Sequence, residues 1–182
     1  MQNNDNIFDY IDHKNNILIS ENELQEGLKD LALKISLDYR DKHIVLIGVL
    51  KGAAMFMMDL SRYIIVPLIY DFISVSNNEG NNSTGTAIIS RDITEKIKNK
   101  HVIIVDDICD TGCTLNHVCM NLLLHKPASL KICVLLNKKT QKKENVKIDF
   151  KGFDIEDKFV VGYGLDYNGK YRNLPFICTI EE

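Results

Sequence analysis

The sequence predicts an α/β protein built on a mostly parallel sheet, and two kinds of pattern support this fold class. Continuous apolar, β-branched runs recur along the chain, as in residues 43–50 and 101–107, and suit strands that are buried on both faces. Stretches with apolar residues at helical spacing follow these runs. A repeated strand–helix–strand order implies parallel strands joined by right-handed crossovers, with helices on both faces of the sheet.

The individual elements follow from the spacing of apolar residues. Ser20 and Glu23 have the spacing of a capping box, which marks the start of a helix. Later helices are predicted from apolar residues three or four positions apart, and strands from runs bounded by polar or glycine-rich segments. In chain order we expect a helix over 21–39, a strand over 43–50, a helix with apolar residues from Ala53 to Leu60, strands over 67–76 and 86–91 around a mobile polar loop (77–85), a strand over 101–107, a helix with apolar residues from Leu115 to Leu122, and a strand over 129–136.

From Asp149 onward the pattern changes. Short strands are expected at 159–163 and 176–180, around a loop rich in Gly, Tyr and Asn. We therefore expect one domain over residues 1–182, with a core over about 20–148 and a small hood subdomain formed by the N-terminal segment and residues 149–182.

Length, charge and cysteine content limit the classes of protein to which this chain can belong. A chain of 182 residues is long enough for one well-packed domain. Its net charge of −3 gives no general attraction to nucleic acid or to an anionic membrane. The N-terminus lacks the pattern of a signal peptide, and no apolar stretch approaches the roughly 20 residues of a membrane span. The 5 cysteines form no CxxC pair and fit reduced thiols in a cytoplasmic protein.

The segment VIIVDDICDTGCTL (102–115) has the strongest functional pattern. Ligands of open α/β sheets bind beyond the carboxyl ends of the strands, where this segment turns into a helix. Gly112 lets the backbone approach a ligand closely, and Thr111 and Thr114 add hydroxyl donors. Because the amides at a helix start point outward with the positive end of the dipole, this turn suits a phosphate.

Three acids complete the pattern. Asp106 and Asp107 can accept hydrogen bonds from the vicinal hydroxyls of a ribose, or hold Mg2+. Asp110 lies between the hydroxyl-binding and phosphate-binding ends, near the expected anomeric carbon. Ribose hydroxyls, a 5′-phosphate and an acid near the anomeric carbon together describe a phosphoribosyl site.

Other interpretations of this segment were weighed. The acids could belong to a solvated loop that caps a helix. A receiver domain also has an acidic pair after a strand, but it needs about 100 residues or more after that strand, and only residues 101–182 remain. Cys109, Cys113 and His117 are spaced i, i+4, i+8 and would share the face of a helix. Gly112 interrupts that helix, however, and a fourth zinc ligand is unassigned.

The strand, the three acids, the Thr-Gly pair and the helix resemble the binding motif for phosphoribosyl pyrophosphate (PRPP) in type I phosphoribosyltransferases. The resemblance extends to the hypoxanthine-guanine phosphoribosyltransferase family, over about residue 15 to the C-terminus. It implies a Rossmann-like core with a hood and a flexible lid loop. It also implies Mg2+-dependent transfer of the phosphoribosyl group of PRPP to hypoxanthine or guanine, giving IMP or GMP and pyrophosphate, by a homodimer or homotetramer.

The resemblance also assigns roles within the two turns that follow strands. Within the motif, it assigns the ribose hydroxyls to Asp106 and Asp107. It makes Asp110 the general base at an imidazole nitrogen of the purine. The segment GVLKG (48–52) is similar to the family's pyrophosphate loop, which has a non-trans peptide between its Leu and Lys. The resemblance assigns the 5′-phosphate to Thr111, Gly112, Cys113 and Thr114, and the pyrophosphate to Leu50, Lys51 and Gly52.

Two further segments match the purine side. LLNKKT (135–140) resembles the segment whose lysine, here Lys138, reaches the purine 6-oxo group. DKFVVGYGLDYNGKYRNLP (157–175) resembles the segment that supplies a stacking aromatic, backbone contacts to the base, an acid that places Mg2+, and an arginine for pyrophosphate. These roles map to Phe159, Val160, Asp166 and Arg172. Asp166 is also assigned to the purine site, where backbone carbonyls near it and near Val160 would read the 2-position of the base. From the residues alone, the same segments are also compatible with a basic loop, a core aromatic residue and a simple turn.

The lid departs from the family pattern. Its usual Ser-Tyr pair is replaced by Asn77 and Asn78, within SVSNNEGNNSTG (74–85). This puts lid packing, turnover and competing PRPP hydrolysis in doubt, because lid closure excludes water from the reacting centre. Cys109 replaces a usually aliphatic residue, a change expected to be neutral.

Two other functions stay open. A PRPP-sensing regulator without catalysis would need a nucleic-acid surface, which the charge of −3 disfavours. A phosphoribosyltransferase for xanthine or a pyrimidine would differ in backbone carbonyls, which a sequence does not reveal.

Overall fold

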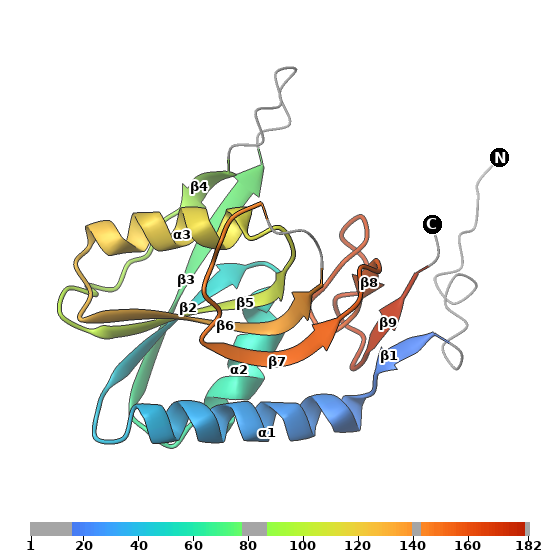
Figure 1. Cartoon of the computed structure of the whole chain (residues 1–182), viewed down its shortest axis with the longest axis horizontal. Coiled ribbons are helices and arrows are strands. Elements are labelled where there is room, and N and C mark those ends of the chain that lie inside the picture. Colours follow the sequence, from blue (N-terminus) through green and yellow to red (C-terminus); the bar gives the residue numbers. More distant parts are fainter. Residues whose placement is uncertain (1–15, 78–86, 140–142, 181–182) are drawn as a thin grey trace.

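The computed structural model describes residues 16–77, 87–139 and 143–180, and a six-stranded sheet lies at its centre (Figure 1). The strand order is β4-β3-β2-β5-β6-β7. All neighbouring strands run parallel except β3 and β4, which are antiparallel. The α/β class is therefore confirmed. The strands are β2 (Ile44–Leu50), β3 (Leu68–Asn77), β4 (Ala87–Arg91), β5 (His101–Cys109), β6 (Ser129–Lys138) and β7 (Phe150–Ile155).

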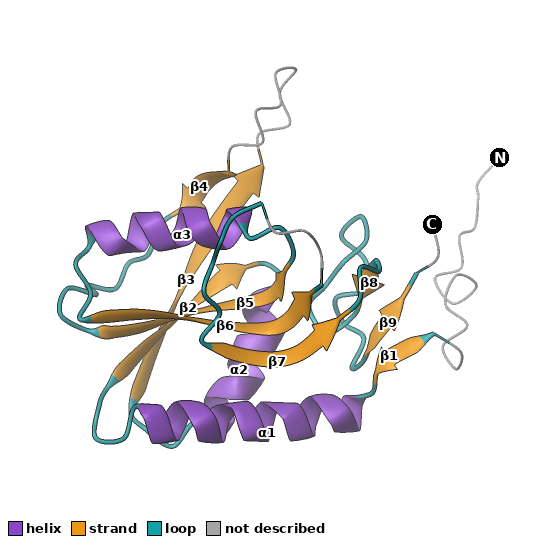
Figure 2. Cartoon of the chain, in the orientation of Figure 1, coloured by secondary structure: helices purple, strands orange, loops and turns teal. Residues whose placement is uncertain are grey.

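Three helices of the described residues cover the sheet on both faces (Figure 2). Helices α1 (Glu21–Asp38) and α2 (Ala53–Tyr63) pack on one face, and α3 (Cys113–Leu124) packs on the other. Along β2, Leu46 faces the α1 and α2 side, whereas Val45 and Ile47 face the α3 side. This alternation explains why the strand is a continuous apolar run, since both of its faces are buried.

Helix α1 begins at the predicted capping box. The Ser20 hydroxyl accepts a hydrogen bond from the Glu23 amide at 3.3 Å, and the Ser20 amide donates to the Glu23 carboxylate at 2.8 Å. Two amides that lack intrahelical partners are thereby satisfied. The apolar stripe behind this cap is buried and consists of Leu24, Leu28, Leu31, Ala32 and Ile35.

The boundary expected between the core and the hood is wrong. Residues 149–182 were all assigned to the hood, but β7 pairs in parallel with β6 as an edge strand of the main sheet. At Gly152 the two strands approach so closely that a Cβ atom would lie 2.6 Å from the Leu135 carbonyl oxygen. The segment between β6 and β7 contains no helix in its described residues, so the strand–helix–strand pattern that revealed the other strands is missing here.

The hood is a second, three-stranded antiparallel sheet in the order β1-β9-β8. It joins β1 (Ile17–Ile19), which the sequence did not predict, to β8 (Val160–Val161) and β9 (Ile177–Thr179). The last two are shorter than expected.

Smaller differences concern strand ends. Strand β5 extends two residues past the predicted end, and Asn77 is the last residue of β3 rather than the first of the loop. Asn78 lies outside the described residues, so its role in a lid stays a prediction. Within the described ranges, no helix is both long and apolar enough to cross a membrane.

The packing of α1 gives a stability prediction. Replacing the fully buried Leu28 by Ala removes packed methyl groups and leaves a cavity. We expect the free energy of unfolding to fall by about 2–5 kcal/mol. The same substitution at Leu33, which lies on the same helix and is 56% exposed, should cost less than about 1 kcal/mol. Urea denaturation of both variants measures the difference, and equal losses would contradict the packing described.

Candidate active site

The turn between β5 and α3 is shaped by Gly112. This residue adopts a left-handed conformation with φ 87°, which costs glycine little. A Cβ atom there would lie 2.8 Å from the Glu144 carbonyl oxygen. No side chain caps α3, so amides of its first turn can serve a ligand.

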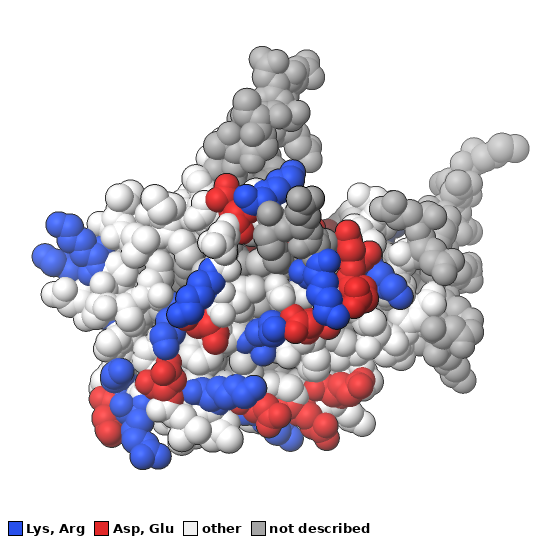
Figure 3. Space-filling model, viewed as in Figure 1, with Lys and Arg blue, Asp and Glu red and all other residues white. Residues whose placement is uncertain are grey.

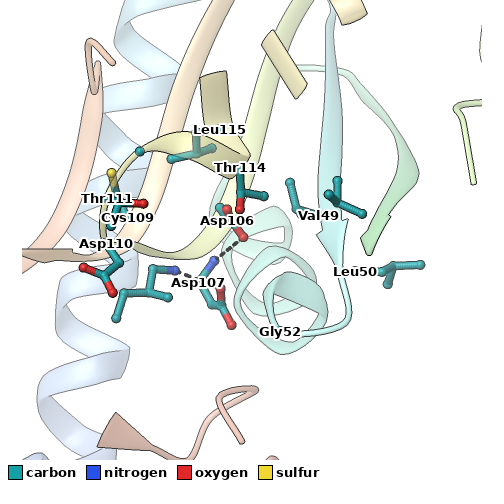
Figure 4. Close-up of a pocket in the computed structure, with 13 residues that line it drawn as sticks. Val49, Leu50, Gly52, Asp106, Asp107, Cys109, Asp110, Thr111, Thr114 and Leu115 are labelled. Atoms are coloured by element: carbon teal, nitrogen blue, oxygen red, sulfur yellow. Dashed lines mark hydrogen bonds between the residues drawn. The ribbon is translucent and has the colours of Figure 1, made fainter. Parts of the chain in front are cut away.

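A cavity of about 280 Å³ lies between this turn and the turn after β2 (Figure 4). The β2 side contributes mainly apolar residues and a glycine, and the β5 side contributes acids and hydroxyls. The β5 side of the cavity thus offers both oxygen acceptors and hydroxyl donors. Its lining residues are Val49, Leu50, Gly52, Val75, Asp106, Asp107, Ile108, Cys109, Asp110, Thr111, Gly112, Thr114 and Leu115.

Asp106 and Asp107 form a pair of adjacent acids, of which Asp106 is buried and Asp107 is partly buried. Asp106 is only 6% exposed, and burial, followed by the neighbouring Asp107 charge, raises its pKa well above the usual value. Burial also raises the pKa of Asp107, although the positive charge of Arg172 opposes that rise. Backbone amides compensate in part, since the amide of Asp107 donates to Asp106 at 3.1 Å and that of Ile108 donates to Asp107 at 2.9 Å. Hydroxyl donors or a cation would stabilise the ionised pair further.

The turn after β2 lies directly against this pair. The Leu50–Lys51 peptide bond is cis, as expected from the resemblance. At Gly52 a Cβ atom would lie 1.6 Å from a carboxylate oxygen of Asp107. The absence of a side chain at Gly52 is therefore what allows the acid to lie there.

A second cavity of about 250 Å³ adjoins the first and shares Asp107, Ile108 and Asp110 with it. It brings together four residues predicted to bind a purine, although they come from the end of β6 and from the hood. The rest of its lining consists of Lys138, Phe159, Val160, Leu165 and Asp166.

Side chains around the second cavity combine charge with an exposed aromatic face. The Lys138 ammonium lies 3.8 Å from a carboxylate oxygen of Asp110 and 3.3 Å from one of Asp157. The Phe159 side chain is 38% exposed, and its ring meets that of Tyr167 edge-on with centroids 5.6 Å apart. A planar heterocycle could stack on Phe159 while Lys138 contacts a polar group on its edge.

Asp166 and Arg172 form an ion pair beside the cavity. The guanidinium lies 2.6 Å from Asp166 and also donates to the Gly164 carbonyl. Asp166 accepts a further bond from the Gly169 amide at 2.7 Å. The hood loop is thus tied to itself at the edge of the second cavity.

Some predicted residues lie outside both linings. Lys51 and Cys113 follow Leu50 and Gly112 in the chain but line neither cavity, and Arg172 reaches the site only through Asp166 and its charge on Asp107. In the part of the chain that the structure describes, no group of three or more His, Cys, Asp or Glu is arranged to hold a metal, so the zinc alternative gains no support.

Sequence reasoning missed several residues of the site. Ile108 and Leu165 line the second cavity, and Asp157 contacts Lys138. Asp157 and Leu165 lie inside the segment 157–175 that was singled out, but only their place in the fold gives them a role. Ile108 lies between the acids at the end of β5, and an isoleucine there gives no signal of a binding role.

The chain is also similar to known proteins in sequence and in structure. A family model for the phosphoribosyl transferase domain matches residues 15–168. The chain is 40% identical over 173 residues to a hypoxanthine-guanine-xanthine phosphoribosyltransferase of Tritrichomonas foetus, covering 94% of each chain. It is 42% identical over 167 residues to a hypoxanthine-guanine phosphoribosyltransferase of Staphylococcus epidermidis, covering 91% of this chain and 93% of that protein. The crystal structure of a hypoxanthine-guanine phosphoribosyltransferase from Bacillus anthracis superimposes with a TM-score of 0.85 at 44% identity, over 91% of this chain and 98% of that one.

The raised pKa of Asp106 predicts that this residue lowers the stability of the folded protein in a pH-dependent way. The folded protein binds the Asp106 proton more tightly than the unfolded chain does, so the cost is absent at low pH and grows as pH rises above about 4. Asp106→Asn keeps an oxygen that can accept from the Asp107 amide but removes the charge. We expect its free energy of unfolding to exceed that of the wild type at pH 7 by roughly 0.5–2 kcal/mol, with little difference near pH 4.

Asp71 provides the matched control, because it is also 6% exposed. Its carboxylate accepts bonds from the amides of Phe72, Thr94 and Glu95. Burial acts to raise the pKa of Asp71, but these bonds outweigh it and lower that pKa. Asp71→Asn should therefore destabilise the protein at pH 7 by about 1–3 kcal/mol. Urea unfolding at both pH values tests the pair, and a loss of stability at pH 7 in Asp106→Asn would contradict the assigned cost.

Proposed function

Because this chain belongs to the phosphoribosyltransferase family, we propose that it transfers the phosphoribosyl group of PRPP to a 6-oxopurine, hypoxanthine or guanine, and releases pyrophosphate. The observation that carries this proposal is that two cavities, one suited to a ribose phosphate and one to a purine, meet at Asp110. The relatives named above support the same class of reaction.

The first cavity is assigned to the ribose 5-phosphate of PRPP. The vicinal hydroxyls would donate to Asp106 and Asp107, which matches the cost of ionising this pair in the free protein. The 5′-phosphate would take the hydroxyls of Thr111 and Thr114 and the amides from Gly112 onward, at the positive end of α3.

The pyrophosphate side would use the turn after β2 and the hood loop. Backbone groups of Leu50, Lys51 and Gly52 lie on one side, and Arg172 supplies a positive charge on the other. Mg2+ takes oxygen ligands and is usually bound through one or two carboxylates together with substrate phosphates. Asp166, aided by Asp106 and Asp107 through the ribose hydroxyls, fits that chemistry. When bound, Mg2+ would neutralise charge on the leaving pyrophosphate.

The second cavity would hold the purine in line with the anomeric carbon. The bond from that carbon to pyrophosphate breaks while a bond to an imidazole nitrogen of the purine forms. Asp110 would take the proton from the other imidazole nitrogen as general base. Lys138 would polarise the 6-oxo group, Phe159 would stack on the ring, and the backbone of Val160 would contact the base edge.

We also propose a homodimer or homotetramer in the cytoplasm. Large apolar side chains on α2 and β3, namely Met55, Ile69 and Tyr70, are exposed and could be covered by a second copy. The five cysteines form no disulfide, which fits a reducing compartment.

Incubation with PRPP, Mg2+ and a panel of bases, with pyrophosphate release as the readout, tests the proposal. We expect release with hypoxanthine or guanine, with xanthine as the case that the sequence leaves open. Adenine, which lacks the 6-oxo group, and orotate are the controls. Chelating Mg2+ should lower the rate by about 100-fold or more, because the metal contributes several kcal/mol to charge stabilisation, and adding it back should restore the rate. Release that does not depend on any 6-oxopurine would refute the assigned reaction.

The role of Asp110 predicts the effect of its loss. Asp110→Asn keeps the shape of the side chain but cannot accept the purine proton. Turnover should fall by roughly 10²–10⁴-fold, with a modest change in PRPP affinity. Asp92→Asn is the matched control, because Asp92 is exposed and contacts Asn121 and His125 near the opposite end of α3. Steady-state kinetics separate the two, and near-normal turnover in Asp110→Asn would remove its assigned role.

A further inference from the structure

A partly buried hydrogen bond links the hood to α2. The Tyr163 hydroxyl donates to a carboxylate oxygen of Asp59 at 2.7 Å, although the two residues lie 104 positions apart. The Tyr163 side chain belongs to the main core and is 5% exposed. Burial, and then the bond to Asp59, raises the pKa of Tyr163, so the hydroxyl keeps its proton at any working pH. Its own amide donates to the Leu174 carbonyl at 2.9 Å, which fixes the residue at both ends.

The residue after Tyr163 touches the turn after β2. Gly164 has φ 103°, and a Cβ atom there would lie 2.1 Å from the Gly52 carbonyl oxygen. Backbone contact of this kind leaves no room for the hood loop to move closer. The bond between Tyr163 and Asp59 acts in the opposite sense, since it limits how far the loop can move away from α2.

The same loop holds Arg172. The Gly164 amide donates to the Arg172 carbonyl at 2.9 Å, and the Arg172 guanidinium donates back to the Gly164 carbonyl. The Arg172 guanidinium also lies 2.6 Å from a carboxylate oxygen of Asp166. The position of Gly164 is therefore coupled to that of Asp166 through Arg172. A shift of Gly164 away from Gly52 would therefore carry both charged groups away from the turn after β2.

We propose that Tyr163 and Asp59 are positioning residues that hold the loop with Asp166 and Arg172 at a fixed distance from the Leu50–Gly52 turn, and so set the affinity for the pyrophosphate group of PRPP. This role rests on the proposed function for its kinetic consequence, but its geometric part stands on the contacts above. The purine side should be less affected. Phe159, Val160 and Asp166 come from the hood, but Lys138 and Asp110 come from the main sheet and its adjoining turn, which this loop does not position.

Substitution of the hydroxyl tests the role. Tyr163→Phe keeps the packed ring and removes only the bond to Asp59. We expect the KM for PRPP to rise about tenfold, as for the loss of one hydrogen bond to a charged group, while the KM for hypoxanthine stays within about twofold. Asp59→Ala should behave in the same way, and Asp59→Asn, which keeps an acceptor oxygen, should recover much of the wild-type value. The double variant Tyr163→Phe/Asp59→Ala should be no worse than either single one.

The matched control is Tyr63→Phe. The Tyr63 hydroxyl donates to the side-chain oxygen of Gln25 at 2.9 Å and links α2 to α1 rather than to the hood. This variant tests whether loss of any tyrosine bond on α2 weakens PRPP binding through general destabilisation. Its KM for PRPP should not change, even if its melting temperature falls as far as that of Tyr163→Phe.

Direct binding separates this proposal from the proposed reaction. Calorimetric titration with pyrophosphate and Mg2+ needs no turnover, and it should give about tenfold weaker binding to Tyr163→Phe than to the wild type. If the wild type proves inactive on every 6-oxopurine, this difference still supports the positioning role. Equal pyrophosphate binding in the two proteins, or equal rises in the KM for PRPP and for hypoxanthine, would overturn it.

Discussion

The rest of the site depends on holding two adjacent carboxylates at the end of a core strand, Asp106 buried and Asp107 partly buried. Removing a charge from water costs free energy, and a second like charge beside it adds to that cost. The protein meets part of this cost with two backbone amides and with the nearby charge of Arg172. A ligand that donates hydrogen bonds to the two acids removes the rest of this ionisation cost. That gain in free energy adds to the affinity for the ligand. Polar groups held in place before the substrate arrives need little reorganisation during the reaction, and lower stability accompanies that arrangement.

The position of the site follows from the meeting of two sheets. The main sheet ends in the acids of β5 and in Lys138 at the end of β6, while the hood supplies Phe159 and Val160. Neither sheet alone provides both a phosphate end and a flat apolar face. Gly164 governs how closely the two parts approach, since a side chain there would overlap the Gly52 carbonyl group.

Local sequence patterns predicted the parts of the fold whose causes are local. The apolar runs of β2 and β5 and the capping box of α1 each depend on neighbouring residues, so the sequence reveals them. Strand β7 was not predicted, and its residues were assigned to the hood, because its segment, FKGFDI, is interrupted by glycine and charge. At the site, the acids and Gly112 stand out within one turn, whereas Lys138 and Phe159 could be assigned only through resemblance. The bond between Asp59 and Tyr163 had no local signal, because its partners meet only in the folded chain.

The charge of the whole chain makes the local arrangement necessary. A net charge of −3 would repel a polyanionic substrate, and on the face seen in Figure 3 positive and negative side chains are interspersed rather than separated. Attraction must therefore arise within a few ångströms of the ligand, where salt screens little and a low dielectric strengthens each contact. Uncapped amides at the start of α3 and the single charge of Arg172 meet that requirement. They attract an anion locally while adding only one positive charge to the protein. Because such contacts act only at short range, their geometry matters more than their number, which is why a loop fixed by backbone contact suits this site better than a surface of lysines.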